Sequence, residues 1–188
     1  MKILKVNTIQ LAHDFIKNYA SVSEDSILID ATMGRGNDTL FLCENFSGDV
    51  TAFDVQQEAL DSTKERLESN GKNARLILDS HSNMDKYFEA DTVSIIVFNL
   101  GYLPKADHHV ATNKVTTIEA IEKGLRLLKK GGIISLCIYQ GGDTGFEEKD
   151  AVMDYLKLLD MRDYTVVVSE LYNKQNYPPI FAGIIKEK

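Results

Sequence analysis

The chain has 188 residues, a formal net charge of −7, 44% hydrophobic residues and 26% charged residues. This length fits one domain with a sizeable core, which we place over residues 1–188. The composition excludes a disordered chain, a collagen-like repeat and a disulfide-rich scaffold. No apolar run approaches the roughly 20 residues of a membrane helix, and the first residues lack the apolar stretch of a secretory signal. We therefore expect a cytoplasmic protein that has no membrane partner.

Short apolar runs alternate with amphipathic segments along the chain, without a linker or an internal repeat. We expect helices at Thr8–Tyr19, Asn37–Asn45, Gln57–Ser69, Asn113–Lys129 (ended by Gly131-Gly132) and Glu147–Asp160. We expect strands at Ser26–Ala31, Asp49–Asp54, Ala74–Leu78, Val93–Phe98, Ile133–Tyr139, Tyr164–Glu170 and Ile180–Lys186. This alternation predicts an α/β fold with a mostly parallel seven-stranded sheet and helices on both faces. Only a loop joins the last two strands, so we expect them to form an antiparallel hairpin.

Polar residues and glycines stand at the carboxyl ends of the first four strands, where ligands of open α/β sheets bind. They are Asp30, Gly34 and Gly36 after the first strand, Asp54 at the second, Ser80 and His81 after the third, and Asn99 after the fourth. Glycines let the backbone turn tightly and approach a ligand closely. An acid at the end of the second strand typically binds ribose hydroxyls. Together these positions predict a nucleoside-type site.

The charges at this site indicate which nucleoside cofactor it accepts. A nicotinamide site would carry G-x-G-x-x-G, but Thr39 stands at the third position, and no Walker motif for ATP is present. Asp30 precedes the glycines and would repel a pyrophosphate, whereas it suits a cation. S-adenosylmethionine carries an ammonium and a sulfonium and has no phosphate, so it is favoured. An NAD-dependent oxidoreductase remains the alternative at this point.

Six motifs span almost the whole chain: D-A-T-M-G-R-G-N-D-T (30–39), F-D-V-Q (53–56), D-S-H-S-N (79–83), N-L-G-Y-L-P-K-A-D-H (99–108), T-T-I-E-A-I (116–121) and N-Y-P-P (176–179). They resemble motifs of class I S-adenosylmethionine-dependent methyltransferases, and more narrowly those of the rRNA methylase family, which includes tRNA (5-aminomethyl-2-thiouridine) methyltransferases. The resemblance implies a Rossmann-like fold, S-adenosylmethionine as cofactor and S-adenosylhomocysteine as product. Two segments depart from the family pattern: Arg35-Gly36-Asn37 replaces Asn-Gly-His, and residues 142–148 lack a histidine.

The resemblance also implies roles for individual residues. By position, it assigns Asp30, Gly34 and Gly36 to the methionine moiety and places Asn37 and Asp38 at the helix entry. It assigns Asp54 to the ribose and Gln56 to the adenine. Ser80 and His81 would flank the adenine amine. Asn99 resembles the first residue of the N-P-P-Y motif of amino methyltransferases, so its carbonyl would accept hydrogens of an acceptor amine. Tyr102 would stack on the acceptor base, and His108 would take the released proton. A solvated polar loop is the alternative for Asp107–His109.

The resemblance favours the 5-aminomethyl group of the wobble 2-thiouridine in the tRNA anticodon loop as substrate. A wobble base is already unpaired, so a small enzyme can reach it. Methylation of rRNA, N-methylation of a small molecule, and non-catalytic binding of S-adenosylmethionine are the alternatives. A homodimer would extend the RNA surface. Cys43 and Cys137 lie in apolar contexts without metal-binding spacing, so no metal is expected.

Two further interpretations concern charge and packing. Residues 99–130 contain six basic and three acidic residues, a local charge of 6 − 3 = +3, which predicts a basic patch for RNA beginning at the acceptor loop. A solvated helix face is the alternative for this stretch. His13, on the amphipathic first helix, is expected to serve packing or the surface.

Overall fold

The computed structural model describes residues 6–100, 114–140 and 145–188. The proposed acceptor residues Tyr102 and His108 lie outside this range, as does Asp107. The helices are α1 (Thr8–Tyr19), α2 (Asn37–Asn45), α3 (Gln57–Ser69), the 3-10 helix η1 (His81–Lys86), α4 (Lys114–Leu127) and α5 (Gly145–Lys157). The strands are β1 (Ile27–Asp30), β2 (Asp49–Asp54), β3 (Arg75–Leu78), β4 (Val93–Leu100), β5 (Leu128–Ile138), β6 (Tyr164–Ser169) and β7 (Ile180–Lys186).

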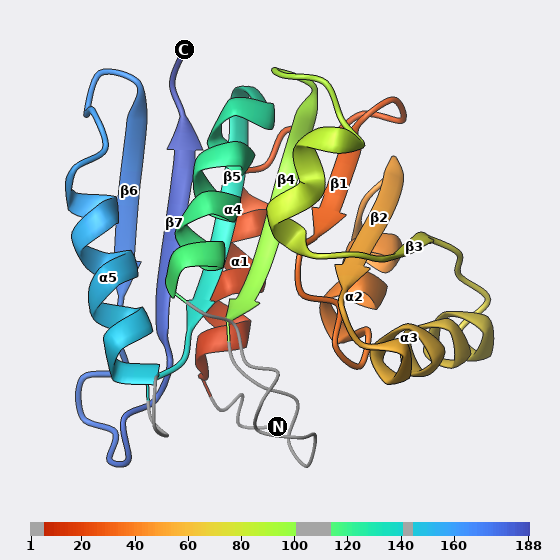
Figure 1. The fold of residues 1–188 in the computed structure, drawn as a ribbon, viewed down its shortest axis with the longest axis horizontal. Helices are drawn as coiled ribbons and strands as arrows, with labels where there is room; N and C mark the ends of the chain where they lie inside the picture. The colour runs from red at the N-terminus through yellow and green to blue at the C-terminus, as the bar shows by residue number, and fades with distance from the viewer. Residues whose placement is uncertain (1–5, 101–113, 141–144) are drawn as a thin grey trace.

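The strands form one seven-stranded sheet in the order β3-β2-β1-β4-β5-β7-β6 (Figure 1). The strands β1 to β5 pair in parallel, whereas β7 runs antiparallel to both β5 and β6. This arrangement confirms the predicted Rossmann-like class I methyltransferase sheet and its C-terminal antiparallel hairpin. The hairpin alone did not imply which of its strands pairs with β5. In the structure β7 lies between β5 and β6, so the last strand in the sequence is an interior strand and β6 is an edge strand.

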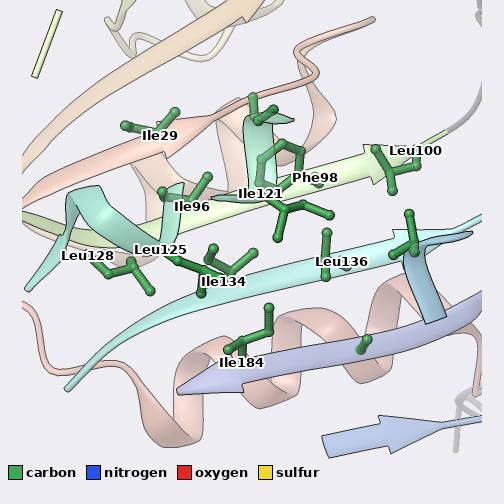
Figure 2. Packing of buried hydrophobic residues seen from close by; sticks show 14 of the residues in the cluster. Ile29, Ile96, Phe98, Leu100, Ile121, Leu125, Leu128, Ile134, Leu136 and Ile184 are labelled. Atoms are coloured by element: carbon green, nitrogen blue, oxygen red, sulfur yellow. The ribbon is translucent and has the colours of Figure 1, made fainter. Parts of the chain in front are cut away.

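Alternating side chains of the sheet form two large cores, and a smaller third cluster of Met33, Ala52 and Ala59 lies beside α3. Ile96 and Phe98 of β4 pack with Ile121 and Leu125 of α4 in the larger core, which Figure 2 shows. The intervening β4 residues point to the opposite face, where they pack with α1 and α2. In Figure 1, α4 and α5 lie in front of the sheet and α1 lies behind it. Helices therefore cover both faces as expected, because a period of two along each central strand makes both faces apolar.

Most expected bounds agree with the structure to within two residues, but the α4–β5 connection differs. The predicted helix Asn113–Lys129 ends at Leu127, and β5 already begins at Leu128. Gly131-Gly132 therefore lies within β5 and does not end a helix, and here the pairing with β4 jumps in register. Gly131 has a φ of 73°, and a Cβ on Gly132 would lie 2.8 Å from the Lys129 carbonyl oxygen, so a side chain at either position would strain the backbone.

Two other elements also differ from expectation. The helix predicted at Glu147–Asp160 begins and ends earlier, at Gly145–Lys157. Strand β4 continues two residues beyond Phe98, so Asn99 belongs to the strand and not to the loop that follows. Across the described ranges, no helix has the length and apolar character needed to cross a membrane.

Candidate functional site

The turn after β1 is shaped by two glycines with positive φ, 49° at Gly34 and 73° at Gly36. A Cβ at Gly36 would lie 2.8 Å from the Thr63 side chain, so α3 packs directly against this turn. The Thr63 hydroxyl donates to the Gly34 carbonyl over 3.2 Å. Gly36 is the N-cap of α2, and it has no side chain that could accept hydrogen bonds from the first N–H groups of that helix. Asn37, the first residue of α2, is exposed. The turn thus presents backbone at the carboxyl edge of the sheet.

Asp54, the last residue of β2, holds the glycine turn from the neighbouring strand. Its Oδ2 accepts from the Gly34 N–H over 3.0 Å, and its Oδ1 accepts from the Gln56 N–H over 3.0 Å. Gln56 in turn is the N-cap of α3. The half-buried Asp54 carboxylate therefore lies beside the turn that follows β1, as the parallel alignment of β1 and β2 predicts.

Asp30, the last residue of β1, is a fully buried carboxyl group. Its oxygens accept hydrogen bonds from the Thr39 hydroxyl at 2.6 Å and from the Thr32 N–H at 3.1 Å. Burial, together with the nearby charges of Asp38 and Asp54, raises the pKa of Asp30 to about 7 against the lowering effect of those two hydrogen bonds. The carboxyl groups of Asp30, Asp38 and Asp54 thus lie near one another at this edge. A cation bound there would favour their ionised form.

Asn99 joins the end of β4 to the first turn of α2. Its backbone N–H donates to the Thr32 hydroxyl over 2.7 Å, and its Nδ2 donates to Oδ2 of Asp38 over 3.0 Å. The other Asp38 oxygen lies 2.7 Å from Nε2 of His13, on α1. The Asn99 Oδ1 atom is buried without a hydrogen-bond partner among the described residues. A buried acceptor without a partner is costly, and a ligand that donates a hydrogen bond would satisfy it.

Ser80 and His81 lie where β3 passes into η1. The Ser80 hydroxyl accepts from the Ser82 N–H over 3.2 Å and so caps this short helix. The His81 ring packs edge-on against Phe98, and burial lowers the pKa of His81, so the ring is neutral at pH 7. Its Nε2 atom is also buried without a partner in the described part of the chain. The site therefore contains a second buried polar atom that a ligand can satisfy.

The carboxyl edge extends past β5 to exposed aromatic side chains. Tyr139 directly follows β5 and is 44% exposed, and Tyr177 before β7 is 66% exposed. Tyr177 packs edge-on against Phe146 of α5, with ring centroids 5.3 Å apart. Gln140 Nε2 donates to the Pro178 carbonyl over 2.7 Å and ties the N-Y-P-P segment to this edge. The segment therefore lies at the same edge of the sheet as the carboxyl end of β5.

The predicted cofactor residues all lie at the carboxyl ends of β1 to β4 or in the segments that directly follow those strands. They are Asp30, Gly34, Gly36, Asn37, Asp38, Asp54, Gln56, Ser80, His81 and Asn99. Sequence analysis missed His13, Thr32 and Thr63. The only local indication for His13 was its place on the half-buried side of α1. Thr32 and Thr63 have common sequence contexts, and only their tertiary contacts reveal them.

Two of the basic residues counted in the predicted patch, Lys129 and Lys130, lie away from the carboxyl edge of the sheet. Helix α4 runs from the carboxyl edge to the opposite edge, where Leu128 pairs with Val93 at the start of β4. Lys129 and Lys130, at the beginning of β5, therefore lie far from the site. Lys123 donates to the Ser82 carbonyl and forms ion pairs with Asp85 and Glu119. A helix separates its two ends in space, so a charge count along the sequence wrongly treats Lys129 and Lys130 as neighbours of the loop. Among the residues that the structure describes, no group of three or more acids, histidines and cysteines is arranged to hold a metal.

Comparisons with known proteins agree with this architecture. A family model described as "Putative rRNA methylase" matches residues 50–185. The chloroplastic tRNA (mnm(5)s(2)U34)-methyltransferase of Arabidopsis thaliana is 33% identical over 170 residues, which cover 84% of this chain and 62% of that protein. The chain thus spans less than two thirds of that relative.

Two solved structures are similar over nearly their full length. A protein from Clostridium thermocellum described as a putative rRNA methylase is 41% identical, with a TM-score of 0.91, and the match covers 98% of this chain and 100% of that one. SMU.1697c from Streptococcus mutans, described as a putative methyltransferase in complex with SAH, is 42% identical with a TM-score of 0.86, and the match covers 97% and 99% of the two chains.

Proposed function

We propose that this chain, which belongs to the putative rRNA methylase family, is an S-adenosylmethionine-dependent RNA methyltransferase. The family match over residues 50–185 supports methyl transfer to RNA. The Streptococcus mutans structure in complex with SAH supports S-adenosylmethionine and S-adenosylhomocysteine as the cofactor pair. The chain's own site residues also fit this cofactor.

The fit rests on charge and on unpartnered atoms. Asp30, Asp38 and Asp54 suit an ammonium and a sulfonium, and would repel the phosphates of a dinucleotide. The backbone of Gly34 and Gly36 leaves room for the methionine moiety, with Asn37 at the helix entry. Asp54 would bind the ribose and Gln56 would lie beside the adenine. The buried, unpartnered His81 Nε2 next to Ser80 would contact the adenine amine.

The methyl acceptor is best explained as an amine. Bound S-adenosylmethionine supplies a methyl group on sulfur, and its transfer leaves S-adenosylhomocysteine. Asn99 Oδ1 would accept a hydrogen from a neutral amine and so direct the nitrogen lone pair toward the methyl group. The observation that carries this step is the Asn99 side chain, held at Nδ2 by Asp38 and unpartnered at Oδ1. In this proposal Tyr102 stacks on the acceptor base and His108 takes the released proton.

The substrate we favour is the 5-aminomethyl group of the wobble 2-thiouridine in a tRNA anticodon loop. The name of the Arabidopsis relative specifies this position of tRNA. The exposed rings of Tyr139, Phe146 and Tyr177 offer surfaces on which unstacked bases can pack. An rRNA is the second candidate, favoured by the family description. A homodimer and a cytoplasmic location stay predictions.

The test is methyl transfer with defined RNA. Purified protein is incubated with radiolabelled S-adenosylmethionine and one of three RNAs: tRNA bearing 5-aminomethyl-2-thiouridine, the same tRNA as an unmodified transcript, and ribosomal RNA. We expect label only in the first, in a nucleoside that chromatography identifies as the N-methylated product. Label in ribosomal RNA alone would replace the tRNA proposal with the second candidate. Absence of label from all three would contradict RNA methylation.

A further inference from the structure

We propose that His13 is a positioning residue for methyl transfer, which holds Asp38 so that Asn99 presents its carbonyl oxygen, and not its amide nitrogen, to the acceptor. This inference rests on the proposed function. It concerns a residue on α1, a helix that precedes the nucleotide-binding unit and contributes none of the predicted cofactor contacts. The inference follows from three adjoining contacts that join α1, α2 and β4.

The first step concerns the orientation of the Asn99 amide. An ionised carboxylate can only accept hydrogen bonds, so the atom that Asn99 directs to Asp38 must be Nδ2. The contact of 3.0 Å between Nδ2 and Oδ2 of Asp38 therefore orients the amide. With Nδ2 engaged, Oδ1 is the atom left for the substrate, and it is buried without a partner among the described residues. If the amide turned over, Asn99 would present a donor, which cannot accept a hydrogen from an amine.

The second step concerns what holds Asp38. Its Oδ1 lies 2.7 Å from Nε2 of His13, which must donate because the carboxylate cannot. The Asp38 side chain is thus held at one oxygen by His13 and at the other by Asn99. A carboxylate held at both oxygens has one orientation, whereas loss of one donor lets it rotate about its own bonds. His13 therefore limits the freedom of Asn99 through Asp38, without touching the acceptor itself.

The third step concerns the rigidity of His13. Its ring stacks on Phe41 of α2 with centroids 3.6 Å apart and an interplanar angle of 4°. Helix α1 is fixed at its start, where the Asn7 side chain accepts from the Gln10 N–H and the Thr8 hydroxyl donates to the Pro179 carbonyl. A side chain locked by packing and by its own helix can position another group. A residue that served packing alone would not need a nitrogen aimed at a buried carboxylate.

Four variants separate positioning from packing. His13→Ala removes both the ring and the donor. His13→Phe keeps a ring against Phe41 but removes the donor, and His13→Gln keeps an N–H donor without the ring. Gln10→Ala is the matched control, because Gln10 is half-buried on the same helix but its side chain bonds to Asp14 outside the site. We expect kcat to fall about ten- to a hundredfold in both His13→Ala and His13→Phe, with KM for S-adenosylmethionine within about twofold. His13→Gln should recover most of the lost kcat, and Gln10→Ala should match the unaltered protein. Full activity of His13→Phe would overturn the proposal, because packing alone would then suffice.

A second measurement needs no RNA and so separates this inference from the proposed function. Asparagine side chains are labelled with nitrogen-15, and the Asn99 amide is identified by its loss in Asn99→Ala. We expect its resonances to move in His13→Ala and His13→Phe, to return in His13→Gln, and to stay in place in Gln10→Ala. An unmoved Asn99 amide in His13→Phe would overturn the positioning role even if turnover fell. If the unaltered protein methylates none of the RNAs, the proposed function fails, while the amide resonances still decide whether His13 orients Asn99.

Discussion

The Nδ2 atom of Asn99 lies 3.0 Å from the Oδ2 atom of Asp38 and joins the end of β4 to the first turn of α2. This contact connects the residue proposed to meet the acceptor with the helix whose start is proposed to face the cofactor. Sixty-one positions separate the two residues in sequence. Their hydrogen bond is therefore a property of the sheet order, which places β4 next to β1 and the turn that begins α2.

Replacing Asn99 by alanine should strongly reduce turnover while cofactor binding remains. The variant loses the carbonyl that would orient the amine, and loss of one aligned polar group in an active site costs about a hundred- to a thousandfold in rate. Single-turnover rates with tRNA, together with calorimetric titration of S-adenosylmethionine, measure the two effects separately. Unchanged turnover would remove Asn99 from the mechanism, and lost cofactor binding would reassign it to the cofactor site.

Replacing Asp54 by alanine should weaken cofactor binding about ten- to a hundredfold, the usual range for a hydrogen bond to a charged group. The change removes the proposed ribose contact and also releases the Gly34 and Gln56 N–H groups that Asp54 holds. Asp49→Ala is the matched control, because Asp49 is exposed at the other end of the same strand. Calorimetry that found the same affinity in both variants would place the ribose elsewhere.

Asp30 should make the stability of the protein depend on pH. Its usual pKa of 3.8 in an unfolded chain rises to about 7 in the folded protein. Between these values the folded state binds more protons than the unfolded state, so the free energy of unfolding falls as the pH rises from about 4 to about 7. This contribution is no larger than roughly 4 kcal/mol. Denaturant unfolding at several pH values should show a flatter profile for Asp30→Asn, and an identical profile would refute the shift.

The same group should couple protons to cofactor binding. A bound cation favours the ionised form of Asp30, so S-adenosylmethionine should release a proton and bind more tightly as the pH rises toward 8. Calorimetric titration in two buffers of different ionisation enthalpy measures the released proton directly. We expect a buffer-dependent heat in the unaltered protein that is absent in Asp30→Asn. Equal heats in both buffers for the unaltered protein would count against the coupling.

Gly183 of β7 should not tolerate a methyl group, because Phe15 of α1 packs against it. A Cβ at Gly183 would lie 2.5 to 2.9 Å from atoms of the Phe15 ring. We expect Gly183→Ala to destabilise the protein by about 1–3 kcal/mol, the usual cost of overpacking, as measured by urea unfolding. Adding Phe15→Leu should recover part of the loss. Additive losses in the double variant would show that the ring is not the obstacle.

Tyr177 should contribute to RNA binding and not to methyl transfer. The ring is exposed and packs against Phe146 beside the carboxyl edge of the sheet. Stacking of one base on an aromatic side chain is worth about 1–3 kcal/mol, so Tyr177→Ala should raise KM for the RNA at least about fivefold with little change in kcat. Tyr172→Ala, which alters a 96% exposed tyrosine in the same connection, is the control. Equal KM values in the two variants would exclude a base contact at Tyr177.

Local patterns in the sequence were enough to predict most of the fold and much of the site. Apolar runs and helix periodicity depend on neighbouring residues, and their bounds mostly agree with the structure to within two residues. The glycines after β1 and the acid that ends β2 also follow from local requirements, a tight turn and a strand end. The exception at Gly131-Gly132 shows the limit of this reasoning. Two glycines after a helix usually end it, but here a bulged strand begins before them.

The sequence by itself determined the elements, their alternation and the acidic strand ends, because these depend on residues close together in the chain. Only the tertiary structure decided that β7 lies between β5 and β6, and that Lys129 and Lys130 lie away from the site. It alone brought His13 to Asp38 and Asp38 to Asn99. The physical reason is that a hydrogen bond needs two groups within about 3 Å. For residues 25 and 61 positions apart, the packing of α1, α2 and β4 sets that distance.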